Sequence, residues 1–152
     1  MANQIQLGNR TFAIGDPGVP RQGILLGAGG GFLQRFSDFV ALPDGSVNFL
    51  TYLTEGGGPI PQDHNAAALL QLGKTEFFTE RERELNRIGF KTMESPRISS
   101  ETVEYLLLIQ ETDLYGMMWN DGGRGDLPEP LRLFVEDMRE ALSRRFEEEH
   151  GS

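Results

Sequence analysis

The last third of the chain most constrains its fold, because two β-prone runs lead directly into a long amphipathic helix. The first run, Val103–Gln110, predicts a central strand that is covered on one face and partly on the other. A polar break at Glu111–Asp113 and a second run, Leu114–Trp119, predict an antiparallel hairpin. The apolar residues of the first run lie on both faces, with Val103, Tyr105, Leu107 and Ile109 on one and Leu106 and Leu108 on the other.

The helix that follows is predicted to pack on the sheet and to face water on its outer side. Asp126 and Glu129 have the spacing of a capping box, and Pro128 and Pro130 suit the first turn of a helix. Ion pairs are expected from Glu136 to Arg139 and from Glu140 to Arg144. The apolar stripe consists of Leu131, Phe134, Val135, Met138 and Leu142 and continues to Phe146, and the polar side carries Arg132, Glu136, Arg139, Glu140 and Arg144.

The middle of the chain predicts a second hairpin and a second helix. The runs 32–42 and 46–53 are joined by Pro43-Asp44-Gly45, a strong turn signal. From Lys74 the pattern is helical, with Thr79 and Glu82 as a second capping box and Gly89 as the stop. The expected fold is therefore α+β: a four-stranded antiparallel sheet with a long C-terminal helix and a second, charged helix.

The N-terminal part, residues 1–28, is predicted to be a hairpin or arm attached to a single α+β domain at 29–148. Two short runs, 4–7 and 11–14, flank a glycine-containing turn and predict the hairpin. Gly23–Leu26 is expected to be at most a short strand. The glycines of 27–31 lack the spacing of a dinucleotide fingerprint, so we interpret them as permitting a sharp bend or a close approach of strands.

Composition excludes several classes of function. At 152 residues the chain is long enough for one domain with its own core. It has no cysteine, which is compatible with a reducing cytoplasm, where we expect the protein to reside. The net charge of −9 disfavours binding to nucleic acid or to an anionic membrane and makes a protein partner more plausible.

No set of residues in the sequence predicts catalysis. The only histidines are His64 and His150, so no metal site is expected, and no cofactor is implied. A Ser-His-Asp triad is compatible with the residue types, but no Gly-x-Ser-x-Gly elbow is present. The chain is therefore expected not to be an enzyme, and Trp119 is expected to be a core or rim aromatic.

Residues 54–62, within the glycine- and proline-rich loop 54–66, are expected to lack regular structure. Two interpretations remain open for them: a connector, or a recognition loop that presents Ile60 in an extended conformation. After them, Asp63–Gly73 is compatible with a short helix, and 69–72 would also pair as an edge strand.

The order of these features resembles small bacterial proteins of the emfourin type, over about residues 29 to 143. The resemblance is carried by Gly29-Gly-Gly-Phe32, the Pro-Asp-Gly hairpin, the charged helix ending in Ile88-Gly-Phe90, Met118-Trp119-Asn-Asp121 and Leu127–Val135. Emfourin inhibits a thermolysin-like metalloprotease. The first 28 residues and the segment 54–66 depart from the shared plan.

The resemblance implies a non-enzymatic protein-binding module that acts as a steric inhibitor of a thermolysin-like metalloprotease. In that mechanism an extended backbone pairs with the protease cleft while Ile60 or Phe32 fills a pocket. Two alternatives are an accessory subunit of a larger assembly, suggested by Leu133 opposite the apolar stripe, and a small enzyme with an unrecognised site. The expected partner-binding residues are Gly30, Gly31, Phe32, Gly57, Gly58, Pro59, Ile60 and Pro61.

Overall fold

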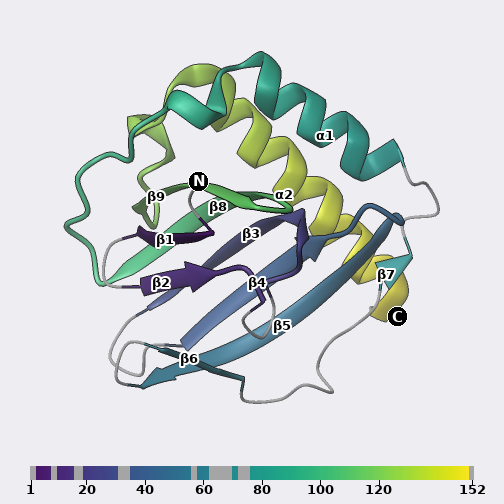
Figure 1. Ribbon diagram of the computed structural model, residues 1–152, viewed down its shortest axis with the longest axis horizontal. Helices are drawn as coiled ribbons and strands as arrows, with labels where there is room; N and C mark the ends of the chain where they lie inside the picture. Colours follow the sequence, from purple (N-terminus) through teal and green to yellow (C-terminus); the bar gives the residue numbers. More distant parts are fainter. Residues whose placement is uncertain are drawn as a thin grey trace.

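The computed structural model describes residues 3–7, 10–15, 19–30, 35–55, 58–61, 70–71 and 76–150. Its main feature is a seven-stranded antiparallel sheet with the order β6-β5-β4-β3-β8-β9, in which β7 also pairs with β5 (Figure 1). A separate hairpin is formed by β1 and β2. The strands are β1 (Gln4–Leu7), β2 (Arg10–Ala13), β3 (Gln22–Gly30), β4 (Arg35–Ala41), β5 (Ser46–Glu55), β6 (Gly58–Pro61), β7 (Leu70–Gln71), β8 (Thr102–Gln110) and β9 (Asp113–Asn120).

The α+β class is confirmed, and each of the four predicted strands is present as β4, β5, β8 or β9. The helices are α1 (Glu76–Arg87) and α2 (Glu129–His150), with short 3-10 turns at Phe90–Thr92 and Arg124–Asp126. The sheet is wider than predicted, because β3, β6 and β7 also join it. Within the described residues, no helix is long and apolar enough to cross a membrane.

The strand β8 has the two-faced pattern that its sequence predicts. All residues from Val103 to Ile109 are buried. Leu106 and Leu108 belong to the core under the helices, whereas Tyr105 and Leu107 belong to the core on the opposite face. Because both faces of the strand are covered, a nearly continuous apolar run is stable at this central position.

The central strand β3 is longer than the predicted four-residue strand. It runs through Gly27 to Gly30 and lies between β4 and β8, so the expected boundary at residue 28 falls inside a continuous strand. A Cβ on Gly27 would lie 2.5 Å from Tyr105 Cε2 and would also meet Asp38 Oδ1. Glycine at this position therefore leaves room for the side chains of Tyr105 and Asp38 from the two neighbouring strands.

Two helices cover one face of the sheet and lie next to each other in Figure 1. The stripe of α2, from Leu131 to Leu142, is buried together with Phe78 and Leu85 of α1. Trp119 is fully buried in this core, as predicted. Gly89 follows α1 with φ +80°, which confirms it as the residue that ends the helix.

Both predicted capping boxes are wrong. Asp126 ends a 3-10 turn, and the carbonyl of Pro128 accepts the first helical hydrogen bonds of α2, from the Leu131 and Arg132 N–H groups. Thr79 lies inside α1, which begins at Glu76. A Ser, Thr or Asp three residues before Glu also occurs within helices and turns, so the spacing alone does not identify the first residue.

The predicted N-terminal hairpin is present as β1 and β2, and it covers the other face of the sheet. Leu7 and Phe12 are buried with Tyr105 of β8, and the Phe12 and Tyr105 ring centroids are 5.4 Å apart. The buried Tyr105 hydroxyl donates a hydrogen bond to the carboxylate of Asp38. The first residues of the chain therefore complete the second half of the core.

Candidate functional site

Gly30 and Ile60, two of the predicted partner-binding residues, lie in the same sheet. Gly30 pairs with Arg35, Arg35 with Leu53, and Leu53 with Ile60, so Gly30 and Ile60 lie in one row across four neighbouring strands. Three strand spacings separate them, a distance of about 14 Å. The predicted residues Gly31, Phe32 and Gly57 lie outside the described residues.

The expectation of an irregular loop is wrong for Gly58–Pro61, which forms the edge strand β6. Strand N–H groups alternate between the two edges, so Pro59 and Pro61 lack their donors on the same edge. The ladder to β5 then depends on the N–H groups of Gly58 and Ile60. Proline fits here because its missing donor lies on the side without a partner strand.

The outer edge of β6 has no partner strand in the part of the chain that the structure describes. On that edge the residues Pro59 and Pro61 present carbonyl acceptors but no N–H donors. Two copies of this edge facing each other would lack donors for a ladder, so self-pairing is disfavoured. A strand from another protein with free N–H groups could still donate to it.

The opposite edge of the sheet, β9, is covered by the segment 93–100. The Met118 N–H donates to Ser95 Oγ at 3.1 Å, and the Asn120 side chain accepts from the Ser99 and Ser100 N–H groups at 2.8 and 2.9 Å. The Asn120 amide also donates to the carbonyl of Arg97 at 3.3 Å. These contacts hold the segment 93–100 against β9 and occupy the Met118 N–H, one of the backbone donors that a further strand would need.

Gly30 marks the point where β3 passes close to β8. Its φ is +119°, a conformation that favours glycine, and a Cβ there would meet the Glu101 carbonyl oxygen. The glycine is therefore required by backbone geometry. Its role in partner binding stays a prediction.

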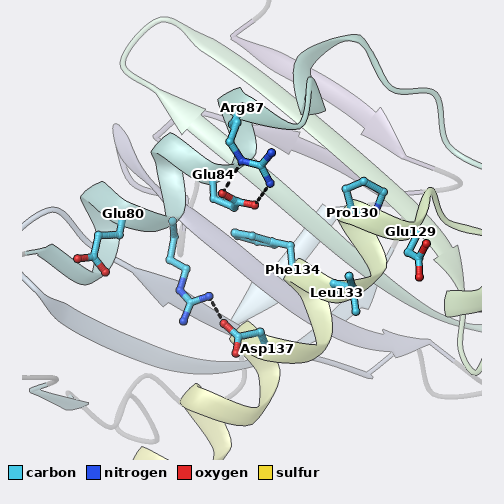
Figure 2. A pocket seen from close by; sticks show the side chains of 9 residues that line it. Glu80, Glu84, Arg87, Glu129, Pro130, Leu133, Phe134 and Asp137 are labelled. Atoms are coloured by element: carbon cyan, nitrogen blue, oxygen red, sulfur yellow. Dashed lines mark hydrogen bonds and ion pairs between the residues drawn. The ribbon is translucent and has the colours of Figure 1, made fainter.

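A second candidate surface is the groove between α1 and α2, with a volume of about 590 Å³. Figure 2 shows Leu133 and Phe134 between the charged side chains of both helices. Leu133 is 53% exposed, as its position opposite the apolar stripe predicts. The groove is lined by Glu80, Arg81, Glu84, Arg87, Glu129, Pro130, Leu133, Phe134 and Asp137.

Ion pairs hold the arginines of this groove in place (Figure 2). Arg81 reaches across from α1 to Asp137 of α2, and its guanidinium lies 6.0 Å from the Phe134 ring centroid. Arg87 bonds to Glu84 at 2.5 Å, and this hydrogen bond lowers the pKa of the Glu84 carboxyl and raises that of Arg87.

A buried charge cluster that was not predicted from the sequence surrounds Glu104. Its side chain is 7% exposed and accepts hydrogen bonds from Trp119 Nε1 at 2.9 Å and from Arg124 at 2.8 and 2.9 Å. Arg139 Nη2 lies 3.6 Å from the same carboxylate. The nearest clue is that Glu104 is a charged residue inside an apolar strand.

Of the two ion pairs predicted along α2, the pair of Glu136 and Arg139 is wrong. Arg139 is directed toward Glu104 rather than water, and burial lowers its pKa. Glu136 pairs instead with Arg132, at 3.1 Å. The predicted pair of Glu140 and Arg144 is confirmed, at 2.6 Å.

Burial of the Glu104 carboxylate by itself would raise its pKa. The hydrogen bonds from Arg124 and Trp119 and the charges of Arg124 and Arg139 outweigh burial, so the pKa of Glu104 is lowered. The carboxylate is thus held ionised by its partners. Its contacts link β8, β9 and α2, which indicates a structural role.

Among the described residues, no group of three or more His, Asp or Glu side chains is placed to hold a metal ion. His64 lies outside these residues. Comparison with known protein families and with curated proteins finds no match for the chain. Function is therefore argued from the two surfaces themselves.

Proposed function

We propose that this protein is a non-enzymatic protein-binding module that engages its partner through the open edge of β6. The observation that supports this most is the difference between the two edges of the sheet: segment 93–100 binds along β9, whereas the outer edge of β6 has no partner strand among the described residues. An open edge allows strand addition, in which main-chain hydrogen bonds supply affinity.

The partner we propose is a thermolysin-like metalloprotease, which the chain would inhibit sterically in the cytoplasm. Support comes from the emfourin-like order of elements and from the extended conformation of Gly58–Pro61. Substrates commonly enter protease clefts as extended strands, so a preformed strand enters with little loss of conformational entropy. In this mechanism Ile60 or Phe32 fills a pocket of the cleft.

The two prolines of β6 also determine which protein donates the hydrogen bonds in this mechanism. Pro59 and Pro61 accept hydrogen bonds but cannot donate them, so the protease must supply the N–H groups. The Ile60–Pro61 peptide bond has no N–H, which also opposes cleavage at that bond. The strand would then remain intact in the cleft.

The test is a titration of thermolysin activity with the full chain. The proposal predicts loss of activity that is complete near one equivalent, with the chain intact by mass spectrometry. Ile60→Asp should weaken inhibition at least tenfold, because a charge enters an apolar pocket. Ser99→Ala, on the covered edge, is the matched control and should inhibit as the parent chain does.

Two results would contradict the proposal. One is unchanged activity of thermolysin at a large excess of the chain. The other is equal weakening by Ile60→Asp and Ser99→Ala, since inhibition would then not depend on the open edge.

A further inference from the structure

The groove between α1 and α2 has an apolar floor that water covers in the isolated chain. Leu133 is 53% exposed and is the one large hydrophobic side chain that is exposed among the residues whose burial the structure describes. It lies beside Pro130, which is also exposed, and Phe134, which is buried except for a small part. These side chains offer a contact for one large apolar group.

Carboxylates dominate the rim of this floor. The lining holds four carboxylates and two guanidinium groups, a net charge of −2. Both guanidinium groups, on Arg81 and Arg87, already pair with carboxylates, those of Asp137 and Glu84. The arginines are therefore not free to hold an anion.

Two carboxylates remain available to a ligand. Glu80 makes no ion pair within the described residues, and Glu129 pairs with Arg132 only at 3.4 Å while its side chain stays 75% exposed. Figure 2 shows Glu80 and Glu129 on opposite sides of Leu133 and Phe134. The groove thus has negative charge at both ends and apolar surface between.

We propose that this groove binds a basic segment of a partner protein, in which one large apolar side chain is flanked by Lys or Arg on both sides. The apolar side chain contacts Leu133 and Phe134, and the flanking cations face Glu80 and Glu129. The charge of the groove repels phosphate-bearing ligands and so disfavours nucleic acid and anionic lipid. This inference does not depend on the open edge of β6.

The test uses a synthetic peptide, acetyl-KRKLFLKRK-amide, titrated into the isotopically labelled full chain and followed by amide NMR shifts. We expect shifts that cluster in 80–87 and 129–137. Leu133→Ser should weaken binding about tenfold, whereas Leu133→Met should retain it. Leu133 is exposed, so neither change should impair folding.

Charge specificity is tested with matched double variants. Glu80→Gln with Glu129→Gln should weaken binding about fivefold, and Glu94→Gln with Glu101→Gln, which removes the same charge from exposed sites elsewhere, should not. The peptide acetyl-KRKSSSKRK-amide should bind more weakly than the parent peptide.

Three outcomes would overturn the inference. Shifts spread over the whole acidic surface, or equal losses in both double variants, would indicate attraction by net charge alone. Equal binding of the serine peptide would exclude an apolar contact. A dimer in sedimentation analysis that Leu133→Ser dissociates would identify a second copy of the chain as the occupant.

Discussion

The two edge strands of the sheet, β9 and β6, differ in what opposes their pairing with a further strand. At β9 (Asp113–Asn120), the Asn120 side chain and the Met118 N–H hold the segment 93–100 along the edge, the latter by donating to Ser95 Oγ. At β6 (Gly58–Pro61), two prolines remove donors while the edge stays uncovered within the described residues. Both arrangements oppose uncontrolled strand pairing.

The difference teaches where a partner can bind. At β9 the segment 93–100 is bonded to Met118 and Asn120, so a new strand would have to displace it. The proline edge keeps free acceptors and therefore selects a partner that brings its own donors. The covered side should consequently supply stability, and the open side should tolerate change in the free protein.

The largest expected effect on stability is at Glu104 of β8, whose carboxylate binds Trp119 of the covered edge strand β9. Glu104→Ala removes the acceptor for Trp119 and Arg124 and leaves the Arg124 and Arg139 cations without their shared carboxylate. Loss of one partner of a buried ion pair costs about 3–5 kcal/mol. Urea unfolding should show this loss, and a change below about 1 kcal/mol would contradict the structural role of the cluster.

A smaller loss is expected when the cover itself is released. Asn120→Ala removes the hydrogen bonds that hold residues 97–100, for a cost of about 1–2 kcal/mol. Asn86→Ala on α1, an exposed asparagine, is the control and should change stability little. If Asn120→Ala matched the control, segment 93–100 would not be held by this side chain.

Acid should lower the free energy of unfolding through protonation of the same Glu104 carboxylate. The pKa of Glu104 is lower folded than unfolded, so its stabilising contribution is complete above its unfolded pKa and is lost as pH falls through the folded pKa. Glu104→Gln lacks this contribution. The difference in unfolding free energy between the parent chain and Glu104→Gln should therefore narrow from pH 7 to pH 3. A difference that stays constant would contradict a lowered pKa of Glu104 in the folded protein.

The smallest effect on stability is expected at the open edge. Pro59→Thr with Pro61→Thr restores two N–H donors on an edge that has no partner strand within the described residues, so stability should change by less than about 1 kcal/mol. Association should change instead, because the edge can now pair with itself. Light scattering should show larger species than for the parent, and a clean monomer would contradict the role of the prolines.

Most of the fold could be predicted from local pattern. The alternation in Val103–Gln110 predicts both cores, and the stripe of α2 predicts the helix face that is buried. The full length of β3 could not be predicted, because Gly27, Gly29 and Gly30 normally weaken a strand. Only the tertiary neighbours, Tyr105 and Asp38 at Gly27 and Glu101 at Gly30, explain why glycine is needed there.

The candidate surfaces were harder to predict than the fold. The sequence indicates Gly58–Pro61 as an unusual segment, but strand pairing with β5 depends on residues far along the chain. Arg139 has the spacing of an outward-facing residue, and only the buried carboxylate of Glu104, from another element, draws it inward. The groove likewise depends on how α1 lies against α2.

The most direct test is hydrogen–deuterium exchange of the chain with and without one equivalent of catalytically inactive thermolysin. The open-edge proposal predicts slower exchange confined to 52–61, because the Gly58 and Ile60 amides already pair with β5 and open less often once the protease holds β6. Exchange in 93–100 and 113–120 should stay unchanged. No gain of protection in 52–61, or a gain confined to the covered edge, would contradict it.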